Sequence, residues 1–306
     1  MSERKQWVNS FSWNTLTVVL QVVIQLLYTA IMARWIAPAD FALMGVVLSI
    51  MGFAEIFSQV GIGPAIIQRK EVSQHHINGA FWTAVGLGAS FTLLFVALAP
   101  WLGEIYQMPK LTIITQVVCT SFFISALGVV PRSFMMKQMA FKTFFKASMV
   151  SIVGGNLLIG LTLAFLGFGV WAYVWALFAQ NALMTLAYWW YTPIKVGWSG
   201  VKQGTKDLLH YGIGSTLFNA LNYAATKVDV SLVPLGLGPQ QGLAAGWYER
   251  SAYVVSLPIT IMAKLSDNVL FSGMSKMQDE PARLRRLVVL TTHVLGLAIV
   301  PASVWV

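Results

Sequence analysis

The chain has 306 residues, of which 57% are hydrophobic and only 10% are charged. An ordinary soluble domain carries roughly 25% charged residues, so this composition excludes a soluble fold and indicates a membrane protein. The formal charge of +9 does not indicate a nucleic-acid partner, because the basic residues lie between apolar segments and do not gather on one soluble face.

Eight apolar segments are long enough to cross a hydrocarbon core of about 30 Å as helices, which takes roughly 20 residues each. In chain order they are residues 9–34, 41–63, 77–102, 110–131, 147–168, 171–192, 209–235 and 241–263, and a ninth begins near Leu287 and reaches Val306. Six prolines fall at the expected boundaries, where a missing backbone N–H costs little: Pro38, Pro100, Pro109, Pro131, Pro193 and Pro239. The sequence therefore predicts an all-α, polytopic transmembrane helical bundle.

Lysine and arginine residues divide unevenly between the alternating loops, which predicts the orientation in the membrane. With the amino terminus in the cytoplasm, sixteen of the 20 fall in cytoplasmic segments: Arg4, Lys5, Arg69, Lys70, Arg132, Lys137, Lys142, Lys146, Lys195, Lys202, Lys206, Lys264, Lys276, Arg283, Arg285 and Arg286. The outer loops hold only Arg34 and Lys110. We interpret most of these cations as topology signals. Residues 133–148 alternate lysine with Phe and Met, and we expect them to form an amphipathic elbow in contact with membrane lipids.

The chain shows no enzyme signature and no cofactor or metal motif. Cys119, the single cysteine, lies in an apolar run and can form neither an internal disulfide nor a redox motif. The adjacent His75 and His76 fall in a cytoplasmic loop, where we expect them to be solvated. No glycine-rich phosphate loop follows a strand, so ATP hydrolysis by this chain is not expected.

An internal repeat relates the first predicted span to the seventh. An offset of 201 residues pairs Thr15 with Thr216, Leu16 with Leu217, Leu20 with Leu221, Pro38 with Pro239 and Gly45 with Gly246. Six crossings separate the two spans, so both start on the same side of the membrane. Repeats of the same orientation, related by an axis along the membrane normal, are one of the standard architectures of secondary transporters.

Each of these two spans carries a stripe of polar residues at helical spacing. The stripe of the first span comprises Ser10, Asn14, Thr17, Gln21, Gln25 and Tyr28, and that of the seventh comprises Ser215, Asn219, Asn222, Thr226 and Asp229. Lipid cannot satisfy such groups, so each stripe must face protein or water. The residues could be hydrogen-bonding contacts between helices, but two matching stripes favour a shared aqueous cavity.

Five ionisable residues fall within predicted spans, where each needs a partner, a cavity or a route to the interface: Glu55, Lys227, Asp229, Glu249 and Arg250. Asp229 extends a polar stripe and is the candidate for ion coupling. Arg250 is the candidate contact for a phosphate-bearing substrate, because its guanidinium stays charged and offers bidentate donors. Lys227 could pair with a neighbouring helix or extend to the interface. Glu55 could equally be a packed counter-ion or a functional group.

Several motifs occur in the order found in a known family. The stretch from Ala33, ARWIAPADFALMGVVLSIMGFAEIFSQVGIGPAIIQRKE, resembles the opening of the polysaccharide transporter family of O-antigen and exopolysaccharide flippases, in particular the colanic-acid exporter type. The matching residues there are Arg34, Pro38, Asp40, Phe41, Gly61 and Gln68, while Ala42 replaces the usual glycine. The segment VPRSFMMKQMAFK is similar to the family's exit from its fourth helix. Asp229, Gly238, Gly246, Tyr248 and Pro258 fit the pattern of the seventh span.

This resemblance implies a two-lobed fold of about twelve to fourteen helices, in the superfamily that includes multidrug and toxin extruders. It divides the chain into a first lobe of six helices (residues 1–192), a cytoplasmic linker (193–208) and the start of a second lobe (209–306). The second lobe is expected to be incomplete, since the chain stops inside its ninth helix.

The implied activity is flipping of undecaprenyl-pyrophosphate-linked oligosaccharide across the bacterial inner membrane, by alternating access and coupled to an ion gradient. The candidate substrate-binding residues are Arg250, Asn14, Gln21, Gln25, Asn219, Asn222 and Thr226. Two alternatives stay open. An exporter of small organic cations would favour acidic cavity residues, and a membrane enzyme of polysaccharide assembly would need a large outer loop.

Overall fold

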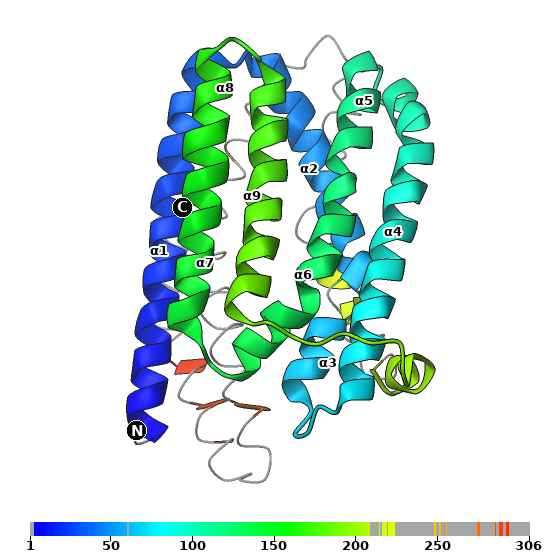
Figure 1. The fold of residues 1–306 in the computed structure, drawn as a ribbon. Coiled ribbons are helices and arrows are strands. Elements are labelled where there is room, and N and C mark those ends of the chain that lie inside the picture. The colour runs from blue at the N-terminus through cyan, green and yellow to red at the C-terminus, as the bar shows by residue number, and fades with distance from the viewer. Residues whose placement is uncertain are drawn as a thin grey trace.

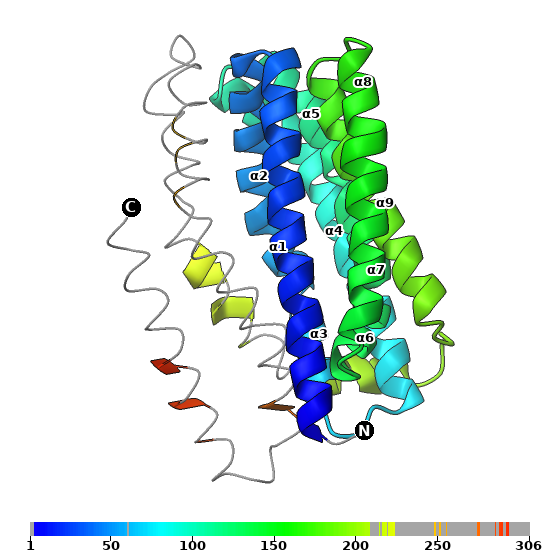
Figure 2. The same cartoon turned by 90° about the vertical axis from the view of Figure 1, so that its left-hand side faces the viewer.

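The computed structural model describes residues 3–59 and 61–208 together with positions 214, 216–218, 220–223, 248, 251, 255, 274–275, 285, 288–289 and 292–293. Every element of regular structure in this part of the chain is a helix, which confirms the predicted all-α class. Figure 1 and Figure 2 show long helices that run side by side along one axis.

The helices follow one another with short connections. They are α1 (Glu3–Trp35), α2 (Pro38–Gln59), α3 (Ile62–Gln68), α4 (Gln74–Ile105), α5 (Pro109–Val118), α6 (Thr120–Lys137), α7 (Phe141–Ile152), the π-helix η1 (Val153–Gly160), α8 (Leu161–Phe165) and α9 (Val170–Tyr191). Residues 201–208 form one further helical segment. Because α5 meets α6 at Cys119, and α7, η1 and α8 are continuous, each of these groups forms a single rod.

Five helical rods among the described residues are long and apolar enough to cross a membrane: Asn9–Trp35, Gln74–Ile105, Pro109–Lys137, Phe141–Phe165 and Val170–Tyr191. They confirm the spans predicted at 9–34, 77–102, 110–131, 147–168 and 171–192. The predicted span 41–63 is instead divided into α2 and α3. Gly61 lies between them with φ 58°, in the left-handed region that glycine adopts without steric cost. The spans predicted beyond residue 208 lie largely outside the described residues.

Two prolines that were predicted to mark boundaries lie inside helices, so that prediction was wrong for them. Pro100 lies in α4 and Pro131 in α6. Both helices continue past the apolar stretch, to Ile105 and Lys137, because polar residues can extend a helix beyond the hydrocarbon core. Pro38 and Pro109 do begin helices, α2 and α5.

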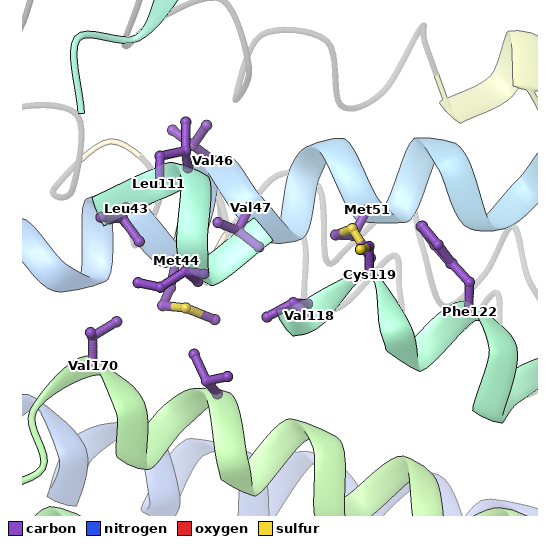
Figure 3. Close-up of a cluster of buried hydrophobic side chains, with 12 residues drawn as sticks. Leu43, Met44, Val46, Val47, Met51, Leu111, Val118, Cys119, Phe122 and Val170 are labelled. Carbon is purple, nitrogen blue, oxygen red and sulfur yellow. The ribbon is translucent and has the colours of Figure 1, made fainter. Parts of the chain in front are cut away.

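The largest buried cluster of apolar side chains joins α2 to α5, α6 and α9, as Figure 3 shows. Its members include Val47 of α2, Leu111 of α5, Phe122 of α6 and Val174 of α9. Lipid is as apolar as these side chains, so van der Waals packing rather than hydrophobic exclusion stabilises such a cluster in a membrane. Large apolar side chains also point outward, for example Leu93 at 71% exposure, as expected of a surface that contacts lipid.

The two ends of the bundle differ in charge. The amino terminus of α1, helix α3, the turn between α6 and α7 and residues 193–208 all lie at one end, the lower end of Figure 1. Eleven of the thirteen lysine and arginine residues up to residue 208 lie in these segments or within about two helical turns of them, and Arg34 and Lys110 lie toward the other end. The expected amphipathic elbow at 133–148 is a tight turn at residues 138–139 between α6 and α7.

Residues 193–208, which we call the linker segment, pack against the amino-terminal end of α4. The indole of Trp82 stacks on that of Trp198, with ring centroids 3.7 Å apart. Asn78 donates to the carbonyl of Ser199 at 2.8 Å and accepts from the N–H of Gly197 at 2.8 Å. The linker segment is therefore fixed on α4 by specific hydrogen bonds.

A buried histidine completes this contact. His76 is 8% exposed, so the prediction that the histidine pair is solvated was wrong for this residue. Its Nε2 atom lies 2.8 Å from Nη1 of Arg69 and 3.4 Å from Oδ2 of Asp207, while Ser73 Oγ lies 2.7 Å from Nδ1. Arg69 also donates to the carbonyl of Asp207 at 2.8 Å. One of these partners, Asp207, belongs to the linker segment, and sequence spacing does not reveal its contact with His76.

Candidate functional site: a polar cavity among four helices

A cavity of about 290 Å³ lies between α1, α6, α7 and α9. Its polar lining residues come from all four helices: Gln21, Ser125, Arg132, Ser151, Gln180, Asn181, Thr185 and Tyr188. The remaining walls are apolar or glycine: Val18, Gly128, Val129, Phe144 and Met184. A concave site with several convergent polar groups among apolar walls is the usual form of a small-ligand site.

Helices α6 and α9 form a rigid wall of the cavity. Thr185 donates to the carbonyl of Ile124 at 3.1 Å, and the indole N–H of Trp189 donates to that of Leu127 at 2.9 Å. Gly128 allows this approach, because a Cβ atom there would lie 3.1 Å from Oγ1 of Thr185. These contacts fix the register of the two helices that carry most of the polar lining.

Arg132 supplies the only charged side chain among the residues that line this cavity. It follows Pro131 in the last turns of α6, and its side chain is exposed. A guanidinium holds two oxygens of a phosphate with parallel donors, whereas an amide such as that of Gln180 can both donate to and accept from a hydroxyl. The lining can therefore bind an anion at one place and hydroxyl groups at others.

The polar stripe of α1 faces protein, and its residues have different surroundings. Gln21 lines the cavity, and Gln25 accepts a 3.1 Å hydrogen bond from the side-chain amide of Asn156 in η1. Ser10 donates to the carbonyl of Met139 at 3.3 Å, and Asn14 is fully buried. One of the three candidates on α1 thus lines this cavity, one joins two helices and one is packed inside the bundle.

None of the remaining candidates is among the described residues that line the cavity. Asn222 lies in a helical piece and is exposed. Glu55 lies in α2, and its side chain falls outside what the structure describes. Six further candidates lie outside the described residues: Asn219, Thr226, Lys227, Asp229, Glu249 and Arg250. The proposed match between the stripes of the first and seventh spans stays a prediction.

Sequence reasoning missed three prominent lining residues, Arg132, Gln180 and Asn181. Arg132 was counted only as a topology signal, although it belongs to the Pro-Arg motif that carried the family resemblance. Asn181 and Thr185, four residues apart, share a face of the sixth span, and Ser148 and Ser151, three residues apart, share one of the fifth. The search that identified the stripe in the first span, applied to the sixth span, would have found Asn181 and Thr185.

Comparison with known proteins identifies the family. The sequence matches the family described as "Polysaccharide biosynthesis protein" over residues 31–306. The chain is 25% identical over 305 residues to the lipopolysaccharide biosynthesis protein WzxC of Escherichia coli K12, covering 99% of this chain and 61% of WzxC. It is 22% identical over 302 residues to the succinoglycan biosynthesis transport protein ExoT of Rhizobium meliloti, covering 97% of this chain and 59% of ExoT. The chain thus spans about three fifths of the length of these relatives.

Two solved structures of MATE proteins have a similar fold. A crystal structure of MATE in complex with MaD3S superimposes with a TM-score of 0.72 at 15% identity, covering 97% of this chain and 72% of that one. The MATE multidrug transporter DinF-BH gives a TM-score of 0.61 at 16% identity, covering 98% of this chain and 72% of that one. At this identity the similarity establishes the fold. Together with the family match, it shows that this chain belongs to the polysaccharide biosynthesis protein family and is a multi-pass membrane protein with a MATE-like helical fold.

Proposed function

We propose that this protein flips a lipid-linked oligosaccharide, with undecaprenyl pyrophosphate as the carrier, from the inner to the outer leaflet of the bacterial inner membrane. The observation that carries the proposal is the cavity in which Arg132 lies among the amides of Gln21, Gln180 and Asn181. A pyrophosphate needs cationic donors, and a sugar needs groups that both donate and accept. The family membership of the chain supports the same cargo.

The proposed architecture is that of a two-lobed transporter in which residues 1–192 form the first lobe, residues 193–208 the linker and residues 209–306 the start of the second lobe. The end that holds the amino terminus and most of the cations would face the cytoplasm. Alternating access would expose the cavity first to the inner leaflet and then to the outer one. Coupling to an ion gradient, with Asp229 as the coupling carboxylate, belongs to this proposal.

Arg132 and Arg250 have separate places in the proposed cycle. Arg132 would bind the pyrophosphate on entry, because it lies near the end of the bundle that holds the amino terminus. Arg250, on the predicted eighth span, would contact the phosphates from the second lobe. The neutral polar residues of the cavity would contact the sugar without fixing its identity.

An exporter of organic cations fits this cavity less well. Attraction of a cation requires carboxylates or an aromatic cage. None of the residues that line the cavity is acidic, and the one charged residue among them is cationic. A membrane enzyme of polysaccharide assembly is not supported by the named relatives, since ExoT is described as a transport protein.

The decisive experiment compares Arg132→Lys and Arg132→Gln in cells that depend on this protein for surface polysaccharide. Three quantities are measured together: surface polysaccharide, lipid-linked intermediate and the amount of protein in the membrane. We expect Arg132→Gln to reduce export and to raise the amount of lipid-linked intermediate at a normal protein level. Arg132→Lys should export more than Arg132→Gln but less than the wild type, because lysine keeps the charge and lacks the bidentate geometry.

Lys146→Gln is the matched control, because Lys146 is an exposed cation at the same end of the bundle but does not line the cavity. Normal export by Arg132→Gln would contradict the assignment of this residue. An equal loss in Lys146→Gln would show that the overall charge of this end matters rather than the site.

A further inference from the structure

A second surface lies on the linker segment, outside the cavity. A shallow hollow of about 760 Å³ is lined by Trp198, Gly200, Val201, Lys202, Gln203 and Lys206. The side chain of Trp198 is 74% exposed even though one face of its ring is stacked on Trp82. An indole with one face covered and the rest open is typical of the membrane–water interface, where tryptophan is enriched.

The helical segment 201–208 has two distinct faces. Gly204 and Leu208, four residues apart, are buried against the protein, while Lys202 and Lys206, also four residues apart, are exposed. Residues one turn apart share a face of a helix, so both lysines point away from the bundle together. In Figure 1 this helix, coloured olive at the lower right, is seen nearly end-on and therefore runs across the bundle axis.

This surface is held in a fixed geometry. A Cβ atom on Gly79 would lie 2.5 Å from the backbone carbon of Gly204, so the backbones of the two helices approach closely at these two glycines. The hydroxyls of Thr83 and Thr205 lie 2.7 Å apart, and Gln74 donates to the carbonyl of Lys195 at 2.7 Å. The lysines consequently project from a backbone that is already ordered, so binding costs little conformational entropy.

We propose that this surface, formed by Trp198, Lys202 and Lys206, is a binding site for the headgroups of anionic phospholipids. The two ammonium groups would contact lipid phosphates as point charges, and the exposed edge of Trp198 would lie at headgroup level. The helix runs in the plane that a membrane surface would occupy, at the basic end of the bundle. This inference is independent of what the protein carries, because no cavity residue takes part.

The charge pattern favours a lipid surface over other partners. Lys202 and Lys206 project beside an apolar indole, the combination by which interfacial helices bind anionic lipid. Each basic residue near such a surface contributes roughly a fivefold preference for an anionic over a zwitterionic lipid. Two lysines together should therefore produce a preference that is readily measured.

The test is native mass spectrometry of the purified 306-residue chain, released from detergent micelles that contain both phosphatidylglycerol and phosphatidylcholine. The wild-type protein should retain phosphatidylglycerol in preference to phosphatidylcholine. In the double variant Lys202→Gln, Lys206→Gln the preference should fall by about fivefold per lysine. The variant Lys202→Arg, Lys206→Arg should keep it, because arginine retains the charge. Thermal unfolding of each variant checks that the linker segment remains docked.

Lys142 and Lys146 provide the matched control, because they are also exposed, also four residues apart and at the same end of the bundle. The neighbouring Phe141 and Phe144, which were expected to contact lipid, are buried in the bundle, so they do not add an exposed apolar surface as Trp198 does. Replacing both by glutamine should leave most of the preference intact. An equal fall in the two double variants would overturn the site in favour of a general charge effect. Displacement of the lipid by inorganic phosphate alone would show a free-anion site instead and would also overturn the proposal.

Discussion

The side-chain amide of Asn156 donates a 3.1 Å hydrogen bond to Oε1 of Gln25, which joins the π-helical stretch η1 to α1. Asn156 is only 3% exposed, so water cannot replace this partner. Single π turns inside α-helices are often found at functional positions, where they re-aim side chains. Here η1 directs Asn156 toward α1.

Removing one member of this pair should destabilise the protein more than removing both. Gln25→Leu and Asn156→Leu each leave a polar group without its partner, and each should cost about 1 kcal/mol of unfolding free energy. The double variant should cost less than either single change, because it leaves no buried polar group without a partner. Thermal unfolding in detergent measures the coupling by a double-mutant cycle. Strictly additive costs would mean that the hydrogen bond contributes nothing.

Close contact between η1 and α9 predicts the effect of adding a single methyl group. In Gly155→Ala the new Cβ atom would lie 2.7 Å from Cα and from the backbone N of Gln180, which cannot move without shifting α9. We expect a loss of roughly 1–3 kcal/mol in unfolding free energy. Gly86→Ala is the control, because a Cβ atom there meets nothing within 4 Å. Equal melting temperatures for the two variants would contradict the close approach of η1 to α9.

The docking of the linker segment predicts a change in protease sensitivity. In Gly79→Ala a new Cβ atom would lie 2.5 Å from the backbone of Gly204 and Thr205, so residues 201–208 should detach from α4. Trypsin should then cleave after Lys202 and Lys206 faster than in the wild type. The rate is followed by mass spectrometry of the fragments, again with Gly86→Ala for comparison. An unchanged rate would argue that the linker segment tolerates the methyl group without moving.

The orientation of the bundle can be tested by labelling from outside intact cells. Cys119 is buried and is replaced by serine, after which single cysteines are introduced at Lys110 and Lys202. The side chain of Lys110 is 73% exposed at the end opposite the amino terminus. An impermeant thiol reagent should modify position 110 in intact cells and position 202 only after the membrane is permeabilised. The reverse pattern would falsify the proposed topology.

The apolar segments of the first 192 residues could be predicted from the sequence because length and hydropathy determine them directly. The segment 171–192 differs from α9 by one residue at each end. The division of 41–63 at Gly61 was not predictable from hydropathy, because a glycine within an apolar run is compatible with a continuous helix. Pro100 and Pro131 were misplaced for a related reason: the end of an apolar stretch is not the end of a helix.

The site was less accessible to sequence reasoning because it depends on which helices meet. Gln21 was found because its stripe is visible on a single helix. Arg132 and Gln180 come from helices whose adjacency no periodicity reveals. The surroundings of His76 were missed because its partners, Arg69 and Asp207, are separated from one another by 138 residues along the chain.

The anchoring of Leu208 has a mechanical consequence. Leu208 belongs to the same buried cluster as Ile62 and Ile66 of α3, although α9 is the last long helix before it. A force that pulls on Leu208 along the chain would therefore act on α3 and on the amino-terminal end of α4 before it reached α9. The hydrogen bonds of Asn78 and Gln74 to the linker segment would resist such a force in shear.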